Sequence, residues 1–173
     1  MPSKRMHMRI QHTPDNLMAL VSDVEDYPRF VNLISSLRIK SEEKISEHKT
    51  RFEADANVTY KMLNESFKSV VETDTAAKTI IVEKSERGGP LRSLLNSWTF
   101  HELSDGSTLV DFLVEVKLKA FPLEILLASK FDGASDQIMD AFKRRADQLY
   151  DNVGDPELDL DAEYKVLGLK RVA

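Results

Sequence analysis

The chain has 173 residues, of which 42% are hydrophobic and 31% are charged, a composition that excludes a disordered chain and predicts one soluble globular domain with a substantial core. Its 24 lysine and arginine residues against 29 aspartate and glutamate residues give a formal net charge of -5, which argues against direct DNA binding. The chain contains no cysteine, which excludes disulfides, thiol nucleophiles and thiolate metal sites.

The N-terminal stretch MPSKRMHMRIQ is basic but is not followed by the long apolar run of a signal peptide. No stretch of the sequence is apolar enough over a sufficient length to span a membrane. Together with the absence of cysteine, this predicts a cytoplasmic protein. Any membrane contact is expected to be peripheral, at the inner membrane.

The first predicted elements are a strand and a helix. Residues 5–10 alternate basic with apolar side chains, which is typical of a strand with one buried face. Thr13 and Pro14 form a cap and a first turn, and the apolar residues that follow have helical spacing, so we predict a helix to about Asp26. The next stretch, YPRFVNLI, is predicted to form a turn and a short helical piece.

Six strands are predicted between Leu37 and about Lys117. Residues 51–58 alternate apolar with polar side chains, and Asp105-Gly106 is a strong hairpin signal. Because short polar turns join these strands in unbroken succession, we expect an antiparallel sheet.

A breaker-rich loop, ERGGP, precedes the strand that holds the only tryptophan. Gly88, Gly89 and Pro90 must lie outside regular structure, and Trp98 and Phe100 then point to one face of the strand. The two aromatic residues lie either at the mouth of a pocket or packed in the hydrophobic core.

The last predicted element is a long helix that opens at Pro122 and ends at about Tyr150. At ~1.5 Å per residue it would span roughly 40 Å, enough to cross a whole sheet, with Gly133 as a candidate point for a bend or an interruption. From Asp151 to Glu163 the chain carries six acidic residues and no basic one. We therefore expect a folded domain at residues 1–150 and a flexible acidic tail at residues 151–173.

This order of elements, β-α-(short α)-six β-α, predicts an α+β fold in which a curved antiparallel sheet wraps around the long C-terminal helix. The space between sheet and helix is either filled or hollow. Ala54, Ala56 and Ser69 are small residues among the inward-facing positions, and they leave room for a cavity or for close approach of the helix. From the residues alone, close packing is the favoured alternative.

Four segments in order, DVEDYPRFV, GGPLRSLLNSWTF, LVDFLVEVKL and FDGASDQIMDAFKRRADQLY, resemble the ubiquinone-binding branch of the START-like (polyketide cyclase/dehydrase) superfamily. The similarity covers about residues 3–150. It implies a helix-grip, START-like lipid-binding domain whose cavity holds ubiquinone or a related isoprenoid lipid, in a lipid chaperone that supports respiratory electron transport. The same branch includes bacterial ribosome-association toxins, and the wider superfamily includes aromatase/cyclase enzymes, so the ribosome as a partner and a cyclase-like activity stay open as alternatives.

The resemblance and the apolar faces together predict which residues contact the hydrophobic ligand. They lie in the entry segment, the breaker loop, the strands and the last helix: Tyr27, Phe30, Val31, Phe52, Phe67, Leu91, Trp98, Phe100, Phe112, Val114, Leu127, Phe131, Ile138 and Phe142.

Catalysis has little support in the sequence, and we expect no catalytic residue, no metal and no catalytic cofactor. The four histidines share no metal-ligand spacing and are expected at the surface or exposed on strands: His7, His12, His48 and His101. Asp111 and Glu115 lie opposite an apolar strand face and are expected to be solvated. The basic run from Lys143 to Arg145 could meet anionic headgroups at a membrane surface.

Overall fold

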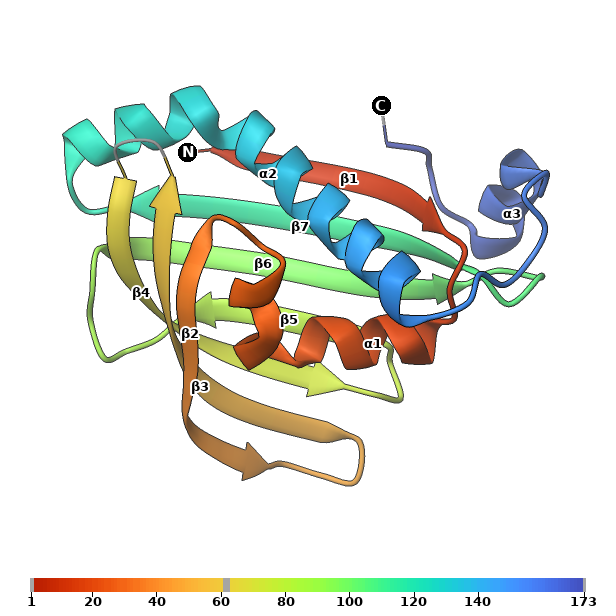
Figure 1. Cartoon of the computed structure of the whole chain (residues 1–173), viewed down its shortest axis with the longest axis horizontal. Helices are drawn as coiled ribbons and strands as arrows, with labels where there is room; N and C mark the ends of the chain where they lie inside the picture. The colour runs from red at the N-terminus through yellow and green to blue at the C-terminus, as the bar shows by residue number, and fades with distance from the viewer. Residues whose placement is uncertain (1, 61–62, 173) are drawn as a thin grey trace.

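The computed structural model describes residues 2–60 and 63–172. One layer is a sheet and the other is helical (Figure 1). In chain order the elements are β1 (Ser3–Ile10), α1 (Pro14–Ser22), the 3₁₀ helix η1 (Val24–Arg29), β2 (Ile34–Lys44), β3 (Lys49–Tyr60), β4 (Leu63–Asp74), β5 (Thr79–Lys84), β6 (Leu91–Glu102), β7 (Thr108–Leu118), α2 (Phe121–Leu149) and α3 (Leu160–Leu167).

The seven strands form one antiparallel sheet in the order β1-β7-β6-β5-β4-β3-β2. The sheet curves, and α2 runs diagonally across its concave face, with α1 and η1 beside it (Figure 1). The predicted α+β helix-grip architecture, including the six successive strands after the first helix, is confirmed.

The first helix begins where the sequence predicts and ends earlier. The Thr13 hydroxyl accepts a hydrogen bond from Asn16 N at 3.2 Å, and Pro14 occupies the first turn. The α-helix stops at Ser22 rather than near Asp26. The chain then tightens into η1, because a helical geometry is disfavoured just before Pro28.

The long helix α2 is continuous and is not interrupted at Gly133. Its second half packs firmly, with Met139 and Ala146 almost inaccessible to solvent. In its first half Ile125 is 56% exposed and residues 128–130 are exposed as well, whereas Phe131 is buried. Both halves of α2 therefore place buried side chains towards the core and exposed ones towards solvent.

The expectation of a flexible tail after residue 150 is wrong for the segment that forms α3. Asp159 caps this helix by accepting bonds from two backbone N–H groups, and Gly168 ends it with φ 69°. Tyr164, 7% exposed, packs against Leu103 and Leu109 on the outer side of the sheet. The acidic residues between the apolar ones obscured this helical pattern in the sequence.

Because α3 covers the outer face of β1 and β7, two predicted surface groups lie beneath it. The His7 side chain is only 4% exposed, with its Nδ1 2.8 Å from the Tyr164 hydroxyl oxygen. The Asp111 carboxylate is largely covered and accepts two bonds from the Arg5 guanidinium, at 3.1 and 2.7 Å. The expectation that His7 is exposed and Asp111 is solvated is therefore wrong.

Three further groups expected to be accessible are partly or fully covered. His12 is fully buried, with Nε2 2.8 Å from an Asp147 carboxylate oxygen, so its predicted exposure is also wrong. His101 is half-buried, as is Glu115, whereas His48 is exposed as expected. Burial lowers the pKa of His101.

Candidate functional site

A cavity of about 280 Å³ lies between the concave face of the sheet and α2. Its wall is built from η1, the segment that follows it, six strands and α2. The interior is therefore hollow rather than completely filled, contrary to the close packing that the residues alone favour.

The hollow arises where small side chains face each other across β3 and β4. Ala54 pairs with Ser69, and Ala56 pairs with Phe67, in the antiparallel register. All four residues line the cavity. Since the side chains of cross-strand partners point to the same face, a small pair leaves space that Val or Leu would fill.

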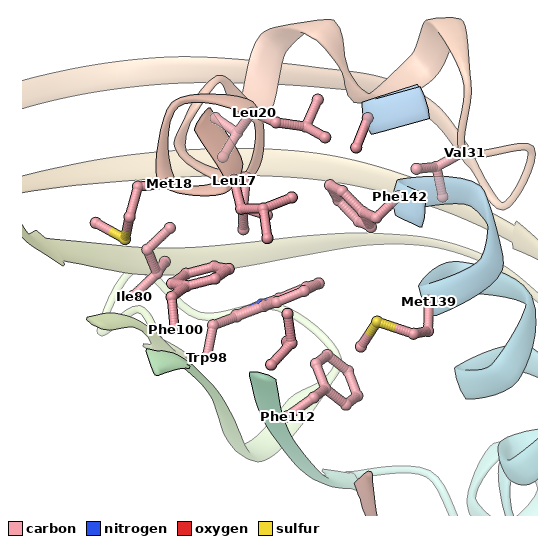
Figure 2. Close-up of a cluster of buried hydrophobic side chains, with 14 of the residues drawn as sticks. Leu17, Met18, Leu20, Val31, Ile80, Trp98, Phe100, Phe112, Met139 and Phe142 are labelled. Atoms are coloured by element: carbon pink, nitrogen blue, oxygen red, sulfur yellow. The ribbon is translucent and has the colours of Figure 1, made fainter. Parts of the chain in front are cut away.

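Trp98 forms part of the cavity wall and is also packed into the core, 4% exposed. Its ring meets Phe112 and Phe142 edge to face at centroid distances of 4.8 and 5.1 Å, and it stacks on Phe100 at 6.1 Å. Figure 2 shows Trp98 in the middle of this cluster, with Met139 and Phe142 approaching from α2. Trp98 therefore both lines the pocket and packs in the hydrophobic core.

Most of the predicted site residues lie in the cavity wall. Eleven of the fourteen line it: Tyr27, Val31, Phe67, Leu91, Trp98, Phe112, Val114, Leu127, Phe131, Ile138 and Phe142. That any of them contacts a ligand stays a prediction.

Three predicted site residues pack outside the cavity wall. Phe30 lies against Phe142 and beneath the Arg145 guanidinium, 5.5 Å from its ring centroid. Phe52 is buried in the core, and Phe100 lies behind Trp98, between the strand and α1 (Figure 2). The alternation of a strand predicts which face a side chain occupies but not how far along the sheet the hollow extends.

The sequence interpretation missed further wall residues. These are Val24, Leu33, Ile34, Leu37, Val58, Val71, Ile80, Val82, Leu94, Asn96, Val116, Ala134 and Ser135. Some of them carried a usable signal: Leu94 and Asn96 precede Trp98 by four and two residues on one strand, and therefore share its face. Ser135 follows Phe131 by four residues on the same helix and shares its side.

The wall is apolar and uncharged within the described residues. Among the described residues that line it, Tyr27 is the one titratable residue, and its hydroxyl donates to the Val21 carbonyl. Burial raises the pKa of Tyr27, so the phenol stays protonated. Among the described residues no three His, Asp or Glu side chains come together to hold a metal ion.

The more accessible wall residues cluster at one end of the sheet. Ile34 pairs with Val58 and Leu94 pairs with Val116, and all four are half-buried. The breaker loop lies at the same end, where a Cβ on Gly89 would be 3.7 Å from the Ser66 carbonyl oxygen. Together with the first half of α2, this end forms the rim of the cavity.

Such a sheet, wrapped around one long helix over an apolar cavity, is a helix-grip architecture. Residues 10–143 match the family described as polyketide cyclase / dehydrase and lipid transport, and the chain belongs to that family. α3 lies beyond the matched residues.

Three similar proteins place the chain within the family. The ribosome association toxin RatA of Rickettsia prowazekii is 28% identical over 149 residues, covering 82% of this chain and 98% of the relative. The mitochondrial coenzyme Q-binding protein coq10 of Schizosaccharomyces pombe is 31% identical over 137 residues, covering 78% of this chain and 80% of the relative. The solution structure of an 18 kDa protein from Caulobacter crescentus has a TM-score of 0.72 at 32% identity, covering 86% of this chain and 98% of the other. These findings confirm the resemblance drawn from the four sequence segments.

Proposed function

We propose that this protein binds ubiquinone or a related isoprenoid lipid in the cavity between the sheet and α2, and that it acts as a lipid chaperone for respiratory electron transport. The observation that carries the proposal is the apolar, uncharged wall of the hollow. Burial of an apolar ligand there contributes roughly 25 cal/mol per Å² of surface removed from water. The similarity to a coenzyme Q-binding protein supports the same ligand class.

The size of the cavity limits how much of such a ligand is enclosed. At about 280 Å³ it lies just below the ~300–1,000 Å³ typical of small-molecule pockets. A quinone ring and the first part of its chain fill that volume. The rest of a long isoprenoid tail extends out of the cavity through the rim, past the first half of α2. The breaker loop beside the rim opens and closes this entrance.

The exposed rim is also suited to contact the surface of a bilayer while the lipid enters the cavity. Within the part of the chain that is described, no helix has the length and apolar character required to cross a membrane. We propose a cytoplasmic protein that visits the inner membrane surface, with Ile125 on the rim and the Lys143–Arg145 run as candidate contacts.

Identification of the bound lipid tests this function. Protein purified without detergent is extracted with organic solvent, and the extract is analysed by mass spectrometry. We expect a quinone or another isoprenoid lipid at close to one molecule per chain. An extract that contains only the phospholipid background of a control protein contradicts the proposal.

The similarity to RatA supports a second candidate, a module that associates with ribosomes. The net charge of -5 counts against a direct contact with ribosomal RNA. Sedimentation of cell extracts through a sucrose gradient separates the two candidates, because the second predicts co-migration with ribosomal subunits and growth arrest on overproduction.

A cyclase-like enzyme is a weaker alternative, so we propose a binding protein rather than an enzyme. General acid–base catalysis needs a titratable group directed at the substrate. Among the described wall residues the only such group is Tyr27, whose hydroxyl is engaged with Val21.

A further inference from the structure

Besides the Tyr27 hydroxyl, three polar side chains of the described residues interrupt the apolar wall of the cavity: Ser69, Asn96 and Ser135. A buried polar group is costly unless it is hydrogen-bonded. The bonds that each of these side chains already makes therefore show what it can still offer to a ligand.

The orientation of the Asn96 amide is unambiguous. Its Oδ1 accepts from Trp98 Nε1 at 2.9 Å, and its Nδ2 donates to the Leu113 carbonyl at 3.0 Å. An indole N–H can only donate and a carbonyl can only accept, so the amide cannot be turned around. The nitrogen has two hydrogens, and Leu113 takes one. No other acceptor in the described part of the chain takes the second, which leaves a fixed donor at the cavity wall.

Ser135 supplies another donor from α2. The residue is 4% exposed and lines the same cavity. Its hydroxyl makes no hydrogen bond within residues 2–60 and 63–172. Ser69 differs, because its hydroxyl already donates to the Ala54 carbonyl at 3.4 Å.

The charge of the wall limits the ligand further. None of the described wall residues is ionised, so a carboxylate or phosphate inside the cavity would have no counter-charge. Moving an unpaired charge from water into an apolar site costs far more free energy than one hydrogen bond contributes to binding. A carbonyl oxygen of a quinone, ketone or ester is neutral and only accepts, which matches two available donors.

We propose that Asn96 and Ser135 select the head of the ligand, and that the cavity admits neutral lipids with carbonyl acceptors while it rejects anionic lipids of equal chain length. This inference rests on the proposed lipid-binding function. It adds which residues recognise the head and which chemical class they favour.

The first experiment titrates the purified protein with decylubiquinone by calorimetry. Ser135→Ala and Asn96→Leu are each expected to weaken binding about three- to tenfold, as the loss of one hydrogen bond predicts. Ser35→Ala is the matched control and is expected to change the affinity less than about twofold, since Ser35 is exposed and is not among the residues that line the cavity. Thermal unfolding of each variant without ligand checks the fold. Asn96→Leu leaves Trp98 Nε1 unpaired, so Ser135→Ala carries the test if that variant is unstable.

The second experiment compares dodecanoate with methyl dodecanoate at pH 8, two ligands that share a chain and differ in charge. The ester is expected to bind at least about tenfold more tightly. Wild-type affinity of both Ser135→Ala and Asn96→Leu for decylubiquinone, or equal binding of acid and ester, overturns the inference and leaves the proposed function standing. If the wild-type protein binds neither decylubiquinone nor the ester, both the proposed function and the inference are wrong.

Discussion

Single residues of the cavity wall also stabilise the fold, and Trp98 is the main example. Its ring contacts Phe112 and Phe142 and is almost fully buried. Its indole nitrogen is bonded to Asn96. A substitution here therefore changes the free energy of unfolding as well as the shape of the cavity.

Trp98→Ala is expected to lower the free energy of unfolding by about 3–5 kcal/mol, because it removes a large buried aromatic side chain. Urea denaturation followed by far-ultraviolet circular dichroism measures the loss. A change below about 1 kcal/mol would mean that the ring is poorly packed, and would assign it to the pocket alone.

Asp105 is expected to make stability depend on pH. Burial alone would raise its pKa, but bonds from the Ser107 hydroxyl and from the backbone N–H groups of Asp155 and Ser107, with the charge of Arg9, outweigh this and lower the pKa to about 2. An unfolded aspartate titrates near ~3.9. The stability contributed by Asp105 is therefore present above about pH 4 and is lost as the pH falls towards 2.

Urea midpoints measured between pH 2 and pH 6 test this dependence. Asp105→Asn is expected to flatten the decline below about pH 4, whereas Glu86→Gln, at an exposed site, serves as the control and leaves the slope unchanged. Identical slopes for the wild type and Asp105→Asn would rule out the assignment.

At the scale of elements, the segment after α2 is fastened to the domain by a few contacts around Asp105. Asp155 N donates to the Asp105 carboxylate at 2.8 Å, and Arg9 Nη2 donates both to that carboxylate and to the Asp155 carbonyl. These bonds lead the chain back over the sheet so that α3 reaches its site on the outer face.

Gly154→Ala is expected to disturb this fastening. Gly154 and Gly106 have nearly equal positive φ angles, 86° and 85°. A Cβ on Gly154 would lie 2.7 Å from the Asp105 Cγ, whereas one on Gly106 would meet no described heavy atom within 4 Å. In both alanine variants the strain of a left-handed backbone is expected to lower the free energy of unfolding by about 1–2 kcal/mol. Gly154→Ala is expected to lower it by about 1 kcal/mol more, because of the contact with Asp105. Equal unfolding free energies for the two variants would show that the clash relaxes without cost.

The sequence predicts some elements better than others. The start of α1 follows from Thr13 and Pro14, and the strands follow from their alternation, because these signals are local. α3 is missed, since its apolar residues are separated by acids and its stability comes from docking on His7, Leu103 and Leu109. The burial of His7 and Asp111 is missed for the same reason.

At the scale of the whole molecule, the hollow depends on which side chains meet across the layers. The inward face of each strand is predictable from its period, and eleven of the predicted residues do line the cavity. Its extent is not predictable from period alone, because it depends on the Ala54–Ser69 pairing and on how far α2 stands from the sheet. The division at residue 150 and the contacts of wall residues with a ligand stay predictions.

The most direct test of the central claim is native mass spectrometry of the wild type and of Ala54→Leu, both purified without detergent. Leucine at this position fills the hollow beside Ser69, so the variant is expected to keep its thermal midpoint within a few degrees and to lose the bound lipid. Ala76→Leu makes the same change at an exposed site and is expected to retain the lipid. If the filled variant carries as much of the same lipid as the wild type, the cavity between sheet and helix is not where the ligand binds.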